Sequence, residues 1–479
     1  MADSKHKYDF VNNTFFSSIA EFSAVFLYIF SVLVARILGP EDYGIFVFAL
    51  SFGTIYALFI RFDFLSYLVR EIPLDVGNGI EKFLRVIGTQ VWLMLFSTSA
   101  MIVICLLLPK TTENKIIIFL VSIAMLFHAF KWSFRGVLRG FDHFRLDSLI
   151  VLNERCMLLG VAVLAFYHSW TLFAIALAFV LVRFIDFTIS LSVVWRKIAA
   201  PKCNLSIKPF ISTLKGAWPF AVMMLLFMIY NYCDTIMISL MRSDKEVGYY
   251  NVAYQVIEGS QLFPSSVTGG LLPLLTINYG INATEYINSL LNFSIEIMFY
   301  MAFPLAMFCS VYASGIVNLL YGGAYLPAVP ALQVMIWSVI VFFLSVIARC
   351  AFYAAKAEKT YALIFGSSVM VNIVLNIPMI NFWGFIGACV STILTEVFVC
   401  IVLFIYLKKL SYQYNLLSRI WKPFLVNILL GVPLYFAYLN NIHVLFAGIC
   451  FVLLYLLTIY FFKLITIGDI RKLRTAPVG

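Results

Sequence analysis

Two long apolar runs are joined by the stretch Arg36-Ile-Leu-Gly-Pro-Glu-Asp-Tyr-Gly-Ile-Phe46. The first run extends over 13–38 and the second over 44–60. The Gly-Pro pair ends the first helix, because proline lacks the N–H that another helical turn needs. The acidic pair then lies at the start of the second helix, where carboxylates interact favourably with the helix dipole. The stretch therefore predicts a tight hairpin between two helices of membrane-spanning length.

The pattern of this hairpin returns in the second half of the chain. An apolar helix, a short acidic turn, a glycine and an aromatic helix recur in Asp234-Thr-Ile-Met-Ile-Ser-Leu-Met-Arg-Ser-Asp-Lys-Glu-Val-Gly-Tyr-Tyr-Asn-Val-Ala-Tyr254. In this alignment Gly44 corresponds to Gly248. Such an echo is typical of transporters that are built from two structural repeats.

Three segments carry a family resemblance: ARILGPEDYGIF, EVGYYNVAYQV and LLYGGAYLPAVPAL. They resemble the polysaccharide-export branch of the multidrug/oligosaccharidyl-lipid/polysaccharide flippase superfamily, and most of all its O-antigen repeat-unit flippases. By layout, the resemblance covers nearly the whole chain. It implies a flippase that moves an undecaprenyl-pyrophosphate-linked oligosaccharide repeat unit across the cytoplasmic membrane by alternating access of two lobes. The implied pathway is the biosynthesis of O-antigen, capsule or a related surface polysaccharide.

Composition independently predicts a membrane protein. Hydrophobic residues make up 63% of the chain and charged residues only 12%. A soluble protein of this length could not cover its surface with so few charges. The net charge of +10 does not indicate nucleic acid, because the basic residues fall in short loops between apolar runs. That distribution is the positive-inside pattern of membrane proteins.

Roughly fourteen runs reach the ~20 residues that a helix needs to cross about 30 Å of hydrocarbon. We therefore expect an all-α polytopic membrane protein. The candidate spans are 13–37, 44–68, 84–108, 116–135, 148–167, 171–195, 216–241, 248–277, 290–312, 330–352, 360–380, 383–407, 422–438 and 444–463.

The spans group into two lobes of six helices each and an appended pair. We expect an N-terminal lobe at 1–197, a basic cytoplasmic linker at 198–215, a C-terminal lobe at 216–409, and two further spans with a tail at 410–479. Six spans separate the two repeats, so the repeats run in the same direction. Their symmetry axis should therefore lie along the membrane normal.

The loop charges predict the orientation. Lys and Arg concentrate in alternate loops and at both termini, and the opposite loops hold little beyond Lys110, Lys115, Arg242 and Lys245. Because basic loops stay on the cytoplasmic side, both termini are expected to be cytoplasmic. The expected location is the cytoplasmic (inner) membrane, spanned many times.

The two hairpins also carry most of the polar residues found within spans. An ionisable group in hydrocarbon is costly and usually faces a cavity or a partner, so these residues are candidates for a substrate cavity. The alternative is that each only bonds a neighbouring helix. Arg61 is the candidate ligand for the substrate's pyrophosphate, and Glu258 the candidate coupling acid. The candidate cavity residues are Glu21, Thr54, Arg61, Asn231, Asp234, Tyr254, Glu258 and Gln261.

A basic ladder follows the end of the fourth span. Lys131, Arg135 and Arg139 are spaced four apart and share one helix face. They are candidates for capture of the carrier's phosphate at the cytoplasmic leaflet. The alternative is ordinary anchoring to anionic lipid. Arg183 and Asp186, three apart in the sixth span, are expected to pair with each other.

Three functions compete on these observations. The first is the lipid-linked glycan flippase, which is not an enzyme. The second is an ion-coupled multidrug or cation extruder of the same superfamily, which requires a cavity dominated by acids. The third, a membrane glycosyltransferase or polymerase, typically requires a larger extramembrane loop than any seen here. The sequence has no nucleotide-binding motif, so no cofactor is expected beyond a coupling ion, H⁺ or Na⁺. Expected partners are the polyprenyl-pyrophosphate-linked glycan, membrane lipids, and polymerase and chain-length proteins of the same pathway.

Overall fold

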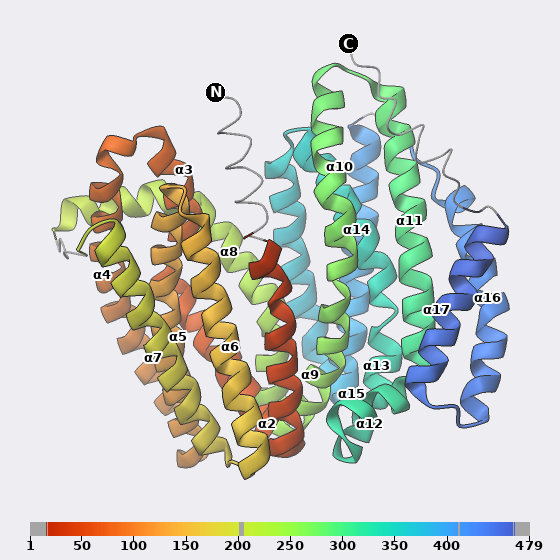
Figure 1. Ribbon diagram of the computed structural model, residues 1–479, viewed down its shortest axis with the longest axis horizontal. Coiled ribbons are helices and arrows are strands. Elements are labelled where there is room, and N and C mark those ends of the chain that lie inside the picture. Colours follow the sequence, from red (N-terminus) through yellow and green to blue (C-terminus); the bar gives the residue numbers. More distant parts are fainter. Residues whose placement is uncertain (1–15, 17, 201–205, 411, 463, 465–479) are drawn as a thin grey trace. The chain divides into compact units, whose positions relative to one another are not determined.

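The computed structural model describes residues 16, 18–200, 206–410, 412–462 and 464 (Figure 1). These residues form helices and turns, and no strand occurs among them. The chain divides into two compact units, Met1–Gly248 and Tyr249–Gly479. The predicted all-α, two-lobed fold is confirmed. The predicted linker at 198–215 lies inside the first unit and stays a prediction, and its residues 201–205 lie outside the described part of the chain.

Long helices build the first unit. Helix α8 packs against α2, α3 and α4, and α5 packs against α2, α3 and α7. The helices are α2 (Ala24–Arg61), α3 (Phe64–Leu74), α4 (Gly79–Leu107), α5 (Thr112–Gly140), α6 (Phe144–His168), α7 (Leu172–Lys197), α8 (Ile207–Met241) and the first residues of α9 (Asp244–Ser260), with the 3₁₀ turn η1 (Val76–Asn78).

The second unit contains the rest of α9 and the remaining helices. Its last two helices form a pair, and α16 packs along α11. The elements are α10 (Leu262–Gly280), α11 (Thr284–Val311), α12 (Ala313–Tyr321), η2 (Gly323–Ala328), α13 (Val329–Met335), α14 (Ser338–Ala354), α15 (Glu358–Lys409), α16 (Leu416–Leu439) and α17 (Val444–Phe461).

The predicted hairpin is present inside α2. Gly39 has φ 73° and ψ 174°, which no helical residue adopts, and the helix resumes at Pro40. The hydroxyls of Ser31 and Tyr43 share a hydrogen bond of 3.0 Å. A straight helix would separate residues twelve positions apart by about 18 Å along its axis, so the chain must fold back between them.

A second reversal occurs inside α15. Gly384 has φ 59° and ψ −142°, a backbone conformation that favours glycine. Ser391 donates a hydrogen bond of 3.4 Å to the carbonyl of Asn372, nineteen residues earlier. The predicted spans 360–380 and 383–407 are therefore the two arms of one hairpin.

The predicted count of fourteen spans is not confirmed. Among the described residues, ten helical segments are long and apolar enough to cross a membrane, or eleven if the bent pair Gly323–Met335 and Ser338–Ala354 counts as one span. Two of the ten, Ser18–Leu74 and Glu358–Lys409, contain the reversals described above. The predicted span 248–277 is divided at Gln261 into α9 and α10. Proline explains this break, since the ring of Pro264 is incompatible with a helical bond to the carbonyl four residues earlier.

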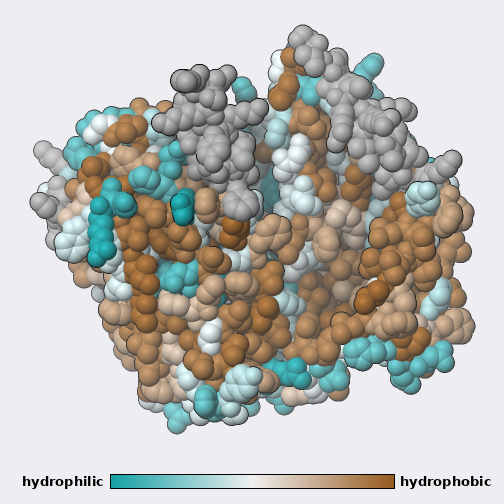
Figure 2. Space-filling view, in the orientation of Figure 1, coloured by the Kyte–Doolittle hydropathy of each residue, from teal (hydrophilic) through white to brown (hydrophobic). Residues whose placement is uncertain are grey.

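Aromatic and aliphatic side chains, most of them from α3, α4 and α5, form one hydrophobic core cluster of the first unit. Phe64, Leu68, Phe83 and Phe134 are completely or almost completely buried there. Figure 2 shows hydrophobic side chains covering much of the outer surface of the helices, with hydrophilic ones mainly toward the helix ends. A surface of this kind is stable in hydrocarbon, where the backbone must be satisfied within each helix.

The C-terminal helix pair is fastened to α11 by polar contacts. The hydroxyl of Tyr455 on α17 donates to the carbonyl of Tyr300 at 2.8 Å. On α16, Arg419 forms an ion pair with Glu296 at 2.6 Å. The pair is therefore an integral part of the second unit, although it has no counterpart in the sequence repeat.

Candidate functional site

A mixed polar pocket of about 240 Å³ lies within the first unit. Four helices contribute to it, α2, α5, α7 and α8. Its walls hold two guanidinium groups and one imidazole among apolar side chains. The lining residues are Thr54, Ala57, Leu58, Arg61, Met125, His128, Ala129, Trp132, Arg183, Met228 and Tyr232.

Arg61 is the last residue of α2 and is held against an aromatic ring. The centre of its guanidinium lies 3.4 Å from the centroid of the Trp132 ring. The guanidinium of Arg135 lies near the same ring, 4.7 Å from its centroid. A cation over an indole face is stabilised by the ring quadrupole, and arginine stacks flat on it. The indole therefore positions Arg61 at the pocket without using its N–H donors.

Arg61 also has a carboxylate neighbour, which helical spacing did not indicate. Residues two apart on a helix do not share a face. The helix ends at Arg61, however, because Phe62 and Asp63 adopt left-handed φ values of 44° and 46°. This turn brings the Asp63 carboxylate to 4.0 Å from the Arg61 guanidinium. That separation is an ion pair at its outer limit and is too long for a hydrogen bond.

His128 faces hydrogen-bond donors on both sides of its ring. Trp132 donates its indole N–H to Nε2 at 2.9 Å, and Nη1 of Arg183 lies 2.7 Å from Nδ1. A neutral imidazole has one N–H and one acceptor nitrogen, and indole and guanidinium can only donate. One of the two contacts therefore sets donor against donor, and the Glu154 carboxylate oxygen, 3.8 Å from Nδ1, is too far away to accept a hydrogen bond from the ring.

A buried ion-pair network lies behind the pocket. Lys131, 1% exposed, forms ion pairs with Glu154 on α6 and with Asp186 on α7, the latter at 2.7 Å. Arg183 forms its ion pair with Glu154. The predicted pairing of Arg183 with Asp186 is therefore wrong. The physical reason is that Lys131 of α5 reaches between the two helices and binds the aspartate.

The rest of the basic ladder is also paired. Arg135 and Arg139 each bind a different oxygen of Asp147, both at 2.6 Å. The ladder thus joins α5 to α6 and, through Lys131, to α7. Phosphate capture by the ladder stays a prediction. For that role these three residues would have to release their carboxylate partners and bind the phosphate instead.

Positive charge and unused donors exceed the available acceptors. Within the described residues of this region, the ion pairs join five cations (Arg61, Lys131, Arg135, Arg139 and Arg183) to four carboxylates (Asp63, Asp147, Glu154 and Asp186). The buried donors Nε of Arg61 and Nε of Arg183 have no hydrogen-bond partner in the described structure, against one unpartnered acceptor in the same network, Oδ1 of Asp186. A buried donor without an acceptor is costly, so the pocket is suited to an anion.

Thr54 shares the pocket with Arg61, and the other predicted cavity residues of the first unit do not line it. The Thr54 hydroxyl donates to the carbonyl of Leu50 at 2.7 Å, and its side chain lines the pocket. Glu21 is exposed. Asn231 bonds back to its own helix, and Asp234 is buried beside Cys233.

The remaining predicted residues belong to the second unit. Tyr254 stacks on Tyr250, with ring centroids 6.0 Å apart. Glu258, near the end of α9, and Gln261, between α9 and α10, are both exposed. Their assignment to the substrate cavity stays a prediction.

Sequence reasoning missed Trp132 and Glu154, which organise the site. Glu154 had a detectable signal, because it is an acid inside a candidate span. Trp132 had none, since an aromatic residue in an apolar helix is usually a packing residue.

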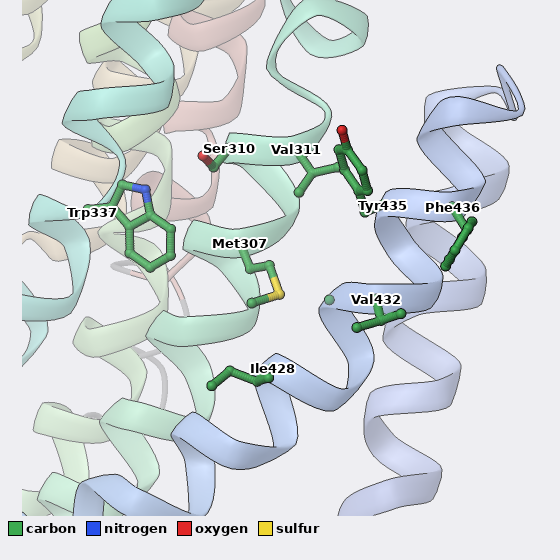
Figure 3. A pocket seen from close by; sticks show the side chains of 9 residues that line it. Met307, Ser310, Val311, Trp337, Ile428, Val432, Tyr435 and Phe436 are labelled. Carbon is green, nitrogen blue, oxygen red and sulfur yellow. The ribbon is translucent and has the colours of Figure 1, made fainter.

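A second, apolar pocket of about 380 Å³ lies in the second unit, between α11 and α16. Figure 3 shows Met307 and Trp337 on one side of it, with Ile428, Val432 and Tyr435 on the facing helix α16. Apart from the Ser310 hydroxyl, the Trp337 indole and the Tyr435 hydroxyl, its side chains carry only carbon and sulfur. It can accommodate a hydrocarbon chain and has no charged group for an ionic ligand.

Comparison with known proteins identifies the family. The profile described as "Polysaccharide biosynthesis protein" matches residues 10–278, more than half of the chain. The chain belongs to this family. A second profile, MatE, matches residues 219–377. The superfamily resemblance drawn from the sequence is thereby confirmed.

Relatives and solved structures agree with this assignment. A putative O-antigen transporter of Shigella flexneri is 22% identical over 377 residues, which cover 75% of this chain and 88% of the transporter. A probable low-salt glycan biosynthesis flippase, Agl15 of Haloferax volcanii, is 25% identical over 48% of this chain and 50% of its own length.

The fold is that of two groups of solved transporters. The lipid II flippase MurJ in an inward closed conformation has a TM-score of 0.70 at 16% identity, covering 94% of this chain and 99% of MurJ. An inward-facing multidrug resistance MATE transporter has a TM-score of 0.66 at 12% identity, covering 82% of this chain and 97% of the transporter. Both structural similarities show a shared fold and nothing more.

Proposed function

We propose that this protein is a flippase that moves a polyprenyl-pyrophosphate-linked oligosaccharide across the cytoplasmic membrane for surface polysaccharide biosynthesis. The observation that carries the proposal is the pocket of Arg61, His128 and Arg183, in which donors outnumber acceptors. Membership of the polysaccharide biosynthesis family and the similarity to flippases support it.

The pocket's chemistry suits a phosphate. A guanidinium grips phosphate oxygens with two parallel N–H bonds, which a lysine cannot reproduce. Arg61 is stacked on Trp132 and has free donors, so it meets the phosphate first. A phosphate oxygen near His128 accepts the hydrogen bond for which the imidazole has no acceptor nitrogen left. It thereby relieves the donor–donor contact at that ring.

The remainder of the substrate needs different surroundings. The polyprenyl tail stays in hydrocarbon, because each CH₂ group gains about 0.8 kcal/mol there. The glycan is carried in a polar cavity while the two lobes alternate between openings. No covalent bond changes, so transport runs down the substrate gradient or is coupled to H⁺ or Na⁺, with Glu258 as the candidate coupling acid. The loop charges favour a cytoplasmic location of both termini.

The second candidate is an ion-coupled multidrug extruder, which the MatE match at 219–377 favours. A cationic drug needs unpaired carboxylates. Around the pocket, Glu154, Asp186 and Asp147 are each bound to basic side chains. The balance of charge around the pocket therefore favours an anionic substrate over a cationic one.

One reconstitution experiment separates these functions. The protein is incorporated in liposomes with a fluorescent undecaprenyl-pyrophosphate-linked sugar, and flipping is followed by quenching of the outer leaflet. We expect flipping of the pyrophosphate lipid, and none of a neutral polyprenol-linked sugar of the same size. Export of ethidium by the same liposomes, without flipping of the pyrophosphate lipid, would overturn the proposal in favour of a drug extruder. A covalently altered glycan would indicate an enzyme.

A further inference from the structure

A third pocket, of about 270 Å³, lies at one end of the second unit and is lined by polar side chains. Its walls come from the end of α11, from α12 and from the connection between α16 and α17, which lie at the same end of this unit (Figure 1). We call it the α12 pocket. Its polar lining residues are Tyr312, Ser314, Asn318, Tyr438, Asn441 and His443.

Contacts between its three walls fix the shape of the α12 pocket. Asn441 has a left-handed φ of 56°, and its N–H donates to the carbonyl of Tyr438 at 3.0 Å, which reverses the chain between α16 and α17. A Cβ added to Gly315 of α12 would lie 3.3 Å from Cβ of Val444, so the glycine lets α12 approach the start of α17. The hydroxyls of Ser314 and Tyr438 share a hydrogen bond of 3.4 Å, which joins α12 to α16. The pocket is therefore formed before any ligand arrives.

One buried hydroxyl among the lining residues has no partner. Tyr312 is 2% exposed, and its hydroxyl has no hydrogen-bond partner in the described structure. Its ring stacks on Phe308, with centroids 5.3 Å apart, and meets Tyr438 edge-on at 5.6 Å. A phenol hydroxyl can donate and accept, and its burial without a partner costs free energy. The position is therefore suited to a ligand that carries hydroxyl groups.

The remaining polar groups favour an uncharged ligand. No lysine, arginine, aspartate or glutamate is among the described residues that line the pocket, so a phosphate there would lack a cation and an ammonium would lack a carboxylate. The exposed amides of Asn318 and Asn441 each supply donors and an acceptor. Nδ1 of His443 accepts the N–H of Leu445 at 3.4 Å, which leaves Nε2 for a ligand. Tyr438, 37% exposed, adds aromatic surface on which C–H groups can pack. This set matches the hydroxyl and C–H groups of a sugar ring.

We propose that the α12 pocket binds a neutral sugar residue of a glycan, with the Tyr312 hydroxyl and the amides of Asn318 and Asn441 as its hydrogen-bonding groups. Its volume of about 270 Å³ lies just below the range of about 300–1,000 Å³ for drug-sized ligands, and suits a single ring. The loop charges predict that this end faces outward, since Gly323 beside α12 belongs to a loop without basic residues. The sugar then belongs to a lipid-linked glycan in the outer leaflet or to a surface glycan without the lipid. The inference goes beyond the proposed function, because binding here needs no transport.

Binding of simple glycosides tests the site. The full-length protein in nanodiscs is titrated with the methyl glycosides of glucose, galactose and N-acetylglucosamine, and binding is followed by saturation-transfer difference NMR at about pH 8, where an imidazole is ordinarily neutral. We expect the parent to bind at least one of them, and Tyr312→Phe to bind it about tenfold more weakly, because a hydrogen bond is lost while the ring still packs. Tyr300→Phe is the matched control, since Tyr300 also buries a hydroxyl without a partner in the described structure and does not line the pocket.

Three results would overturn the proposal. The first is that the parent binds none of the three glycosides. The second is that Tyr312→Phe and Tyr300→Phe bind them with equal affinity. The third is that glycerol 1-phosphate or ethanolamine binds more tightly than the glycosides, because a charged headgroup would then be the ligand.

Competition identifies the source of the sugar. Displacement of the glycoside by a neutral polyprenol-linked sugar in the nanodisc would indicate a lipid-linked glycan, and displacement by a soluble oligosaccharide alone would indicate a glycan without the lipid. Both results support the site. A protein that binds the glycoside and fails to flip the pyrophosphate lipid would refute the proposed function and leave this site standing. A protein that flips the lipid and binds no glycoside would refute this site alone.

Discussion

Replacing Arg61 by alanine should abolish most flipping of a pyrophosphate-linked glycan. Arg61 is stacked on Trp132 at 3.4 Å, and its Nε has no hydrogen-bond partner among the described residues. Its donors are therefore available to a ligand. The Asp63 carboxylate, at 4.0 Å, competes only weakly for them.

The magnitude follows from the hydrogen bonds lost. A guanidinium fork makes two charge-assisted hydrogen bonds with a phosphate, each contributing about 1.5–3 kcal/mol. Their loss costs at least about 3 kcal/mol, and each 1.4 kcal/mol is tenfold, so Arg61→Ala should lower flipping at subsaturating substrate about a hundredfold or more. Arg61→Lys keeps the charge without the fork and should lower flipping about tenfold.

The assay is flipping in liposomes together with complementation of surface glycan at matched expression. Arg85→Ala is the control, since Arg85 pairs with Glu81 on an exposed helix face and contributes about 0–1 kcal/mol. It should leave flipping unchanged. The reasoning is refuted if Arg61→Ala combined with Asp63→Ala restores export, because Arg61 would then serve only to neutralise Asp63.

Three further predictions follow from the structure and the loop charges. Lys131→Met should lower stability by about 3–5 kcal/mol, because it leaves the buried Asp186 without its cation, although Glu154 keeps Arg183. Arg139→Ala should cost much less, since Arg135 still binds Asp147, and equal thermal unfolding midpoints of the two variants would contradict this. Glu258→Gln should remove any pH dependence of transport while the protein still inserts, and a wild-type pH profile would exclude Glu258 as the coupling acid. Single cysteines at an outer set of positions should label from outside the cell, and those at an inner set should not. Labelling from outside the cell at position 202, a residue that the structure does not describe, would reverse the orientation. The outer set is Asp42, Ser243 and Gly323, and the inner set is Asp142, Lys202 and Lys359.

Local features of the chain were predictable because they depend on short-range physics. Apolar runs of about 20 residues predict membrane helices through a non-directional effect that needs no knowledge of partners. The Gly39-Pro40 break depends on the φ of one residue and the missing N–H of the next, and it is present in the structure. The correspondence of Gly44 and Gly248 was also visible in the sequence.

Partners of the charged groups were decided only by the tertiary structure. Spacing along one helix indicates which residues share a face, and it does not indicate which helix that face meets. Arg183 was therefore paired with Asp186 of its own helix, whereas Lys131 of another helix binds that aspartate. Asp63 approaches Arg61 because the backbone leaves the helix at Phe62, a left-handed residue with no sequence signal. Ion pairs and pockets depend on how separate helices pack, and that packing is set by long-range contacts.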